Sequence, residues 1–271
     1  ATDASRGRDL SIVVWTTTVG AVLGPNLVGP GEWVGAAIGM PALTGAYVFT
    51  IVSQLVGIAL YLVALRPDPL LLAHEVVAAH DGMAARIARA DRPVAARYAT
   101  FAIVGAHGVM VSIMAMTPVH LLHHGATLTV VGLTISLHIA GMYALSPLFG
   151  LLADRWGRVP TIVLGYAILG GCVVVIAFGQ KDTAAVTVAL VLLGLGWSAA
   201  MVAGSTLLTE ASAEKLRTRR QGRNDFMMSL VAAVGATGAG AVMNGIGFSG
   251  LAWTTVPILL AVVVLAPLGR R

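Results

Sequence analysis

The 271-residue sequence has few charged residues, few aromatic residues and almost no cysteine. Its one cysteine, Cys172, cannot form an intrachain disulfide and does not indicate a redox compartment. Only 11% of the residues are charged and 6% are aromatic, whereas 57% are hydrophobic and the mean hydropathy is +0.87. A water-soluble domain of this size would expose too much apolar surface with such a composition. The composition therefore predicts a membrane protein.

Long apolar runs account for this composition. A helix that crosses a bilayer needs roughly 20 apolar residues. The runs are continuous rather than alternating, so they predict helices and not the strands of a barrel. We therefore predict an all-α, polytopic membrane protein with eight transmembrane helices. The predicted spans are residues 10–29, 41–65, 97–121, 127–151, 159–179, 184–209, 225–246 and 250–268.

Turn-forming residues separate these runs. We expect Gly29-Pro30-Gly31, His124-Gly125 and Gly247-Phe248-Ser249-Gly250 to reverse the chain. We also expect Asn224 or Asp225 to cap the helix over 225–246.

One gap, residues 66–96, is much longer than the others and mixes apolar with charged residues. Leu71, Leu72, Val76 and Val77 could share one face, which predicts an amphipathic helix on the inner membrane surface. The gap divides the chain into residues 1–65 with two spans, a cytoplasmic linker over 66–96, and residues 97–271 with six spans.

The basic residues are distributed unequally between the two sides of this arrangement. Of the 17 lysines and arginines, 16 lie at the chain ends or in alternate gaps, and Lys181 alone lies in the other set of gaps. Basic loops remain in the cytoplasm. The distribution therefore predicts a multi-pass protein of the cell membrane with both chain ends in the cytoplasm.

The net charge of +5 does not indicate binding to nucleic acid, because the basic residues lie in short loops between spans and not along one soluble face. We expect the anionic headgroups of the lipid bilayer to be their partners instead.

The gap between the fourth and fifth spans carries the most specific motif. It reads Gly-Leu-Leu-Ala-Asp-Arg-Trp-Gly-Arg over residues 150–158. This motif resembles the cytoplasmic loop motif of the major facilitator superfamily, although Val159 occupies its last basic position. The resemblance implies a loop that changes contacts during a conformational switch. The matching residues are Gly150, Asp154, Arg155, Gly157 and Arg158.

A second motif lies in the first span. Gly20, Gly24, Pro25 and Gly29 resemble the fifth-helix motif of antiporters in the same superfamily, with Val28 replacing one glycine. Pro25 removes a helix hydrogen bond, which favours a hinge or a closely packed surface, although a simple proline kink is an alternative.

The resemblance implies twelve spans in two six-helix halves joined by a cytoplasmic linker. The eight spans would then be helices 5–12, with a complete C-terminal bundle and an incomplete N-terminal bundle. The remaining N-terminal helices would be a partner of this chain, which is either a fragment or the product of a truncated gene. The resemblance also implies that Asp154 approaches the first span near residues 10–13.

Polar side chains inside the spans are candidates for a cavity that holds a substrate or a coupling proton. No acidic or basic residue lies near the middle of a span, so His107 and His138 are the ionisable candidates. Each could instead be a neutral imidazole that hydrogen-bonds to a neighbouring helix. The other candidates for this cavity are Tyr143, Trp197, Gln54 and Asn244.

His120, His123 and His124 have the spacing of metal ligands on one helical face, but no cysteine or carboxylate accompanies them. We therefore predict no metal site and no cofactor, and interpret the three histidines as an interfacial cluster.

The function predicted from these features is secondary transport of a small, amphipathic or hydrophobic solute by alternating access, with proton-coupled efflux as the preferred direction. The alternative is a non-transporting scaffold or sensor, or a truncated remnant, of the same fold. We do not expect an enzyme, because no nucleophile with a base and no pair of acids lies within the bilayer.

Overall fold

The computed structural model describes residues 20–41, 44–64, 66 and 91–271, and every regular element in these ranges is a helix. The predicted all-α class is confirmed. Six helical segments of this part are long and apolar enough to cross a membrane. They are Ala46–Ala64, Pro93–His123, Leu128–Trp156, Arg158–Gly179, Thr183–Glu210 and Glu214–Val264.

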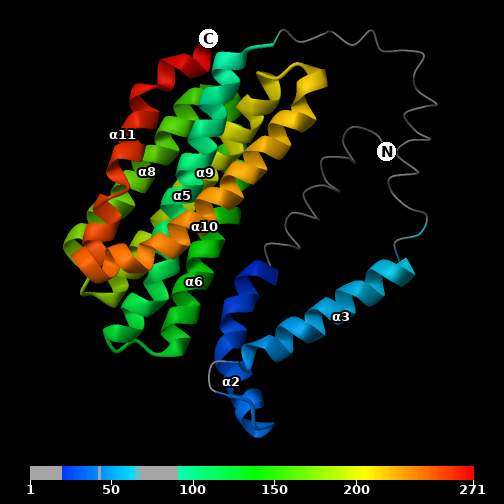
Figure 1. Cartoon of the computed structure of the whole chain (residues 1–271), viewed down its shortest axis with the longest axis vertical. Helices are drawn as coiled ribbons and strands as arrows, with labels where there is room; N and C mark the ends of the chain where they lie inside the picture. The colour runs from blue at the N-terminus through cyan, green and yellow to red at the C-terminus, as the bar shows by residue number, and fades with distance from the viewer. Residues whose placement is uncertain (1–19, 42–43, 65, 67–90) are drawn as a thin grey trace. The chain divides into compact units, whose positions relative to one another are not determined.

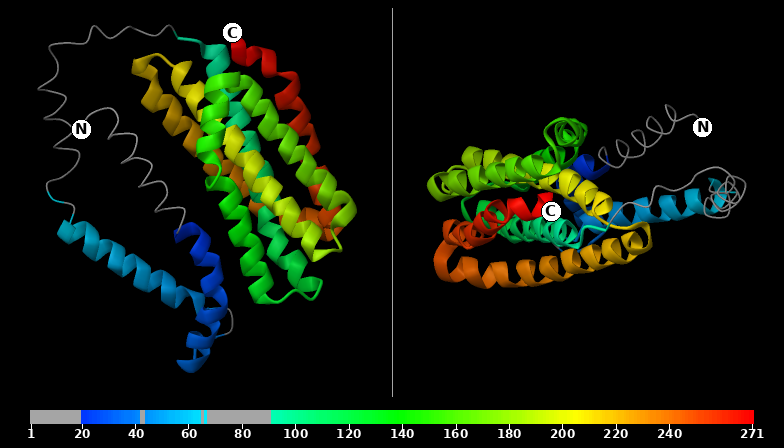
Figure 2. Two further views of the ribbon diagram at one scale, coloured as in Figure 1. Left: turned by 180° about the vertical axis from the view of Figure 1, so that it is seen from behind. Right: turned by 90° about the horizontal axis from the view of Figure 1, so that it is seen from above.

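The described residues divide into two compact units, one formed by residues 20–26 with 91–271 and the other by the described residues of 27–66. The described helices of the first unit lie side by side as a bundle (Figures 1 and 2). They are α5 (Pro93–His123), α6 (Leu128–Tyr143), α7 (Ser146–Trp156), α8 (Arg158–Gly179), α9 (Thr183–Glu210), α10 (Glu214–Trp253) and α11 (Val256–Val264), followed by the 3-10 helix η2 (Ala266–Arg270).

Helix α9 lies at the centre of this bundle and packs against α5, α6 and α8. Two glycines allow its neighbours to approach closely on opposite sides. A Cβ atom at Gly196 would lie 2.7 Å from the carbonyl oxygen of Gly165 in α8, and one at Gly194 would overlap the carbonyl oxygen of His138 in α6. Small residues at such crossings allow backbones to meet where no water drives helix association.

Proline interrupts the fourth predicted span. Pro147 has no N–H for the carbonyl oxygen of Tyr143 one turn earlier, so the helix ends there and restarts as α7. The Ser146 hydroxyl donates to this carbonyl at 2.7 Å. The backbone acceptor is therefore satisfied although the helix is broken.

Three turns of the bundle contain a glycine with positive φ, at Gly125, Gly157 and Gly247. Gly125 has φ 83° between α5 and α6, and Gly247 has φ 77° within the segment labelled α10. After Gly247 the chain turns into a short helical segment and then α11, which runs back along the bundle (Figure 1). The turns predicted at His124-Gly125 and Gly247-Gly250 are confirmed.

The turn predicted at Gly29-Pro30-Gly31 is wrong. These residues lie in the first turns of α2 (Val28–Ala37), where a proline costs little because the first N–H groups of a helix need no intrahelical partner. The chain turns instead between Gly39 and Gly45, before α3 (Ala46–Ala64). In this second unit, α2 packs against α3 through Gly31, where an added Cβ would lie 2.7 Å from the Cα of Ala46.

The predicted cap at Asn224 or Asp225 is also wrong. Helix α10 begins at Glu214, so both residues lie inside it. A helix can continue through polar residues beyond the membrane boundary, which an apolar run does not reveal. The amphipathic helix predicted in the linker falls on residues 67–90, outside the described part, and most of the first predicted span falls on residues 1–19, which are likewise outside it.

Candidate functional site

The motif of residues 150–158 forms the end of α7 and the start of α8. Gly157 joins the two helices with φ 98° and ψ 161°, a conformation almost confined to glycine. The sharp junction brings Asp154 and Arg158 together, one turn apart along the chain. Their side chains form an ion pair with 2.5 Å between Oδ1 and Nη1.

Arg158 has a second carboxylate partner that the sequence analysis did not identify. Its Nη2 and Nε atoms donate to Glu210 at 2.9 and 3.4 Å, at the end of α9. Arg158 thus connects the ends of three helices, α7, α8 and α9. Pairs as accessible as these contribute only about 0–1 kcal/mol to stability, so they suit contacts that form and break.

Asp154 is the more accessible partner, with 66% of its side chain exposed against 31% for Glu210. It can therefore exchange Arg158 for another partner more easily than Glu210 can. The predicted approach of Asp154 to residues 10–13 lies outside the described residues. Arg155 of the same motif is exposed. Gly150 lies in open space, since no atom is within 4 Å of a Cβ added there.

The motif of the first span coincides with a change of helix type. Residues 20–23 are helical, Gly24–Leu27 form the 3-10 helix η1 with Pro25, and α2 follows with Gly29 near its start. This segment packs closely against α6 at Gly132, where an added Cβ would lie 2.8 Å from the carbonyl oxygen of Pro25. Asn26 also donates to the hydroxyl of Ser136 at 2.7 Å.

Three of the predicted cavity residues lie together. The indole N–H of Trp197 in α9 donates to Nδ1 of His107 in α5 at 3.3 Å. The ring of Tyr143, at the end of α6, lies edge-on to Trp197 with 6.1 Å between centroids. Trp197 is buried and His107 half-buried. Helices α5, α6 and α9 thus contribute one polar aromatic cluster, which we call the His107 cluster.

The other three predicted cavity residues lie elsewhere. His138 is fully buried between α6 and α9, and its Nδ1 hydrogen-bonds to the carbonyl oxygen of Leu190 at 2.8 Å. This placement favours the alternative role, in which the imidazole joins two helices. Asn244 is exposed on α10, and Gln54 is exposed on α3 in the second unit.

The histidines at the far end of α5 have structural contacts. Nε2 of His120 hydrogen-bonds to the carbonyl oxygen of Gln180, and its ring stacks on Phe248 with 4.3 Å between centroids. The Gln180 side chain accepts the N–H of Ser249 at 3.0 Å. These contacts join the α5–α6, α8–α9 and α10–α11 turns. Among the described residues, no group of three or more histidines, cysteines or carboxylates could hold a metal.

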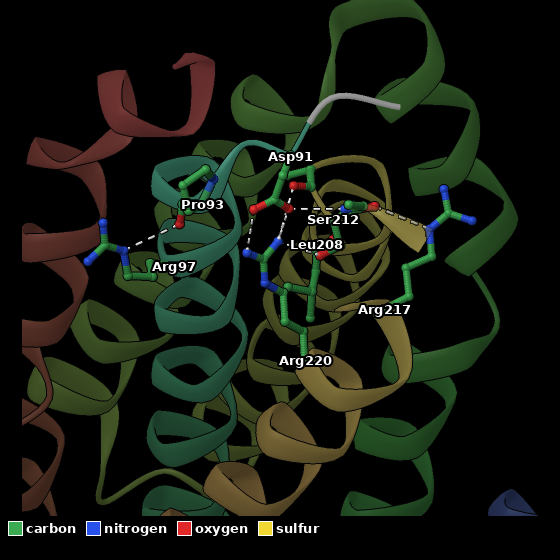
Figure 3. Close-up of polar contacts among 9 residues, drawn as sticks. Asp91, Pro93, Arg97, Leu208, Ser212, Arg217 and Arg220 are labelled. Atoms are coloured by element: carbon green, nitrogen blue, oxygen red, sulfur yellow. Dashed lines mark hydrogen bonds and ion pairs between the residues drawn. The ribbon is translucent and has the colours of Figure 1, made fainter. Parts of the chain in front are cut away.

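At the opposite end, the residues preceding α5 are fastened to the α9–α10 turn (Figure 3). Arg220 of α10 donates to both carboxylate oxygens of Asp91, at 2.6 and 2.9 Å. Asp91 also accepts the N–H of Ala213, and the N–H of Arg92 donates to the carbonyl oxygen of Ala211. The hydrogen bond from Arg220 and then that from Ala213 hold the pKa of Asp91 below its usual value.

The sequence analysis missed this contact between Asp91 and Arg220. The available clue was charge. Asp91 is an acidic residue two positions before Pro93, and residues 215–223 supply five cations at the same predicted side. Charge alone could not choose Arg220 among them, because their positions depend on how far α10 extends toward the linker.

Comparisons with known proteins agree with the motif of residues 150–158. The family model described as Major Facilitator Superfamily matches residues 99–270. An uncharacterized MFS-type transporter of Bacillus subtilis, YddS, is 35% identical over 90% of this chain and 57% of its own length. A second one, YdeG, is 33% identical over 93% of this chain and 60% of its own length.

A more distant relative is the riboflavin transporter RfnT of Brucella anthropi, which is 27% identical over 97% of this chain and 65% of its own length. The chain therefore spans between 57% and 65% of the length of these three relatives. No solved structure matches the chain significantly.

Proposed function

Because the chain belongs to the Major Facilitator Superfamily, we propose that it is part of a secondary transporter that moves a small, amphipathic or hydrophobic solute across the cell membrane by alternating access. Residues 97–271 would form its C-terminal six-helix bundle, residues 1–65 the last two helices of its N-terminal bundle, and residues 66–96 the cytoplasmic linker between them. The full protein would have twelve spans.

The His107 cluster is the observation that supports transport most directly. Ionisable groups inside a span are costly and mark binding sites or ion pathways. His107 is only half-buried and shares a hydrogen bond with Trp197, whereas His138 is completely enclosed. Of these two histidines, His107 is therefore the one that a solute or a proton could reach.

The chemistry of the cluster favours a solute with a flat apolar part and a polar group. Tyr143 and Trp197 can contact a ring through edge or face, and His107 can exchange a hydrogen bond with a polar substituent. The riboflavin transporter among the relatives supports this class, since riboflavin contains a flat aromatic ring system. Histidine also changes charge near neutral pH, so His107 could carry a coupling proton.

The ion pairs of Arg158 would form the switch. In one state Arg158 holds Asp154 and Glu210, and in the other Asp154 would move to a partner on the N-terminal bundle. Gly20, Gly24, Pro25 and Gly29 would let the first span bend during this change, and their resemblance to the antiporter motif implies proton-driven export as the direction. The exchange of weak, accessible pairs keeps the two states close in energy.

The test is transport by the full-length protein in liposomes, with and without a proton gradient. A panel of flat amphipathic solutes, riboflavin among them, is assayed for uptake driven by an imposed gradient. We expect gradient-dependent transport of at least one solute, reduced about tenfold or more by Trp197→Ala. His107→Gln should reduce the uptake driven by the proton gradient more than it reduces the exchange of solute across the membrane without a gradient. Phe178→Ala is the control, because Phe178 is 87% exposed on α8, away from the cluster.

Failure of every solute to move would favour the non-transporting alternative. Equal loss with Phe178→Ala and Trp197→Ala would show that the His107 cluster is not the site. Transport that is unchanged by the proton gradient would exclude proton coupling but not the proposed solute site.

A further inference from the structure

A groove follows the seam between α8 and α11. Its middle section has a volume of about 350 Å³ and is lined only by apolar residues and Tyr166. A second section, of about 480 Å³, shares Val263 with the first and extends toward Arg270. The lining of these two sections includes Ala167, Gly170, Leu260, Val163, Pro160 and Pro267.

The groove ends in a basic pocket of about 400 Å³. This pocket shares Val159, Pro160 and Arg270 with the preceding section, so the three hollows are connected. Its charged lining consists of Arg92, Arg158 and Arg270 against the single carboxylate of Glu210.

Two of these cations are uncompensated. Arg158 is held by Glu210 and Asp154. In the part of the chain that the structure describes, neither the Arg92 nor the Arg270 guanidinium forms an ion pair with a carboxylate. Among the described residues, the pocket therefore has more cations than carboxylates, which suits an anionic ligand.

The dimensions of the groove suit a molecule with one acyl chain along the helix seam. From Pro160, α8 rises roughly 21 Å to Val174 at the far end of the groove, at 1.5 Å per residue. The groove is therefore long enough for an acyl chain to cross one leaflet, whose hydrocarbon thickness is roughly 15 Å. The exposed ring of Trp156 lines the basic pocket, and tryptophan is enriched at the level of lipid headgroups.

From this geometry we infer that the α8–α11 groove is a binding site for an anionic phospholipid. Its phosphate lies between Arg92 and Arg270, and one acyl chain lies along Val163, Ala167 and Val263. A soluble anion would make no contact with the apolar sections, and the cationic headgroup of a zwitterionic lipid would bring a further positive charge beside Arg92 and Arg270. This site is separate from the His107 cluster and does not depend on the protein transporting a solute.

The site is tested by native mass spectrometry of the full-length protein, titrated with phosphatidylglycerol or with phosphatidylcholine of the same acyl chains. We expect phosphatidylglycerol to bind more tightly. Arg92→Gln and Arg270→Gln should each reduce that preference about fivefold, the effect of one basic residue near an anionic headgroup. Arg219→Gln is the matched control, because Arg219 is exposed on α10 and does not line the groove.

A second pair of variants tests the apolar part independently. Ala167→Phe places a ring in the groove and should weaken binding of both lipids, whereas Ala233→Phe, at an exposed position of α10, should not. Equal binding of the two lipids by the unmodified protein would overturn the inference. So would an effect of Arg219→Gln as large as that of Arg92→Gln, or displacement of the lipid by inorganic phosphate alone.

Discussion

At the scale of single residues, Gly157 shows how one position shapes the motif loop. Its φ of 98° and ψ of 161° lie where a Cβ atom is strongly disfavoured. We predict that Gly157→Ala destabilises the protein by about 1–3 kcal/mol, the cost of such backbone strain. Thermal unfolding in detergent should show a lower midpoint than for the unmodified protein.

Gly150→Ala is the control within the same motif. A Cβ at Gly150 meets no atom within 4 Å, and alanine favours a helix over glycine by about 1 kcal/mol. Gly150→Ala should therefore leave the unfolding midpoint unchanged or raise it. Equal midpoints for the two variants would contradict the conformational role of Gly157.

The lowered pKa of Asp91 predicts that the stability of the protein depends on pH. Its pKa is lowered from 3.8 in the folded protein, first by the hydrogen bond from Arg220 and then by that from Ala213. A lowered pKa contributes stability above the unfolded value, and this contribution is lost as the pH falls through the folded value. Asp91→Asn should therefore lower the unfolding midpoint at pH 7 and have a diminishing effect as the pH falls below about 3.8. An effect of the same size at all pH values would exclude this linkage.

The motif predicted which residues of the loop would matter, but not all of their partners. The sequence places Asp154 and Arg158 one helical turn apart, so their pairing could be anticipated. Glu210 lies 52 positions from Arg158 along the chain. Their contact depends on the packing of α8 against α9, which hydropathy does not describe.

At the scale of helices, hydropathy located α5, α8 and α9 well because proline, glycine and aspartate mark their ends. Hydropathy placed a helix end wrongly where glycine and proline lie inside a helix. Gly29, Pro30 and Gly31 lie inside α2, since glycine and proline are common in membrane helices. It could not orient the helices either. Of the five predicted cavity residues in the bundle, His107, Tyr143 and Trp197 lie together and His138 and Asn244 do not, because helix rotation decides which side chains meet.

The α8–α9 crossing provides a test of close helix packing. A Cβ at Gly196 would lie 2.7 Å from the carbonyl oxygen of Gly165 and 2.8 Å from the side chain of Leu169. Gly196→Ala should force the two helices apart and destabilise the protein by about 1–3 kcal/mol, as overpacking does. Gly170→Ala on α8 meets nothing within 4 Å and should be neutral in the same unfolding assay. Destabilisation by Gly170→Ala alone would contradict this packing argument.

At the scale of the whole molecule, the two ends of the helical bundle of residues 93–270 differ in chemistry. One end carries the ion pairs of Arg158 and Arg220 together with the basic pocket at Arg270. The other end is joined by the contacts of His120, Gln180 and Phe248 and carries Lys181. Basic residues are retained on the cytoplasmic side of a membrane. We therefore expect the Arg158 end to face the cytoplasm.

Cysteine labelling in intact cells tests this orientation. Cys172, the one cysteine of this chain, is buried and is replaced by alanine, together with any cysteine elsewhere in the full-length protein, to give a background without thiols. In this background, Lys181→Cys should react with a membrane-impermeant maleimide added outside, whereas Arg219→Cys should react only after permeabilisation. Both positions are exposed, so a difference in labelling reports the side of the membrane and not burial. Labelling of position 219 in intact cells would reverse the proposed topology.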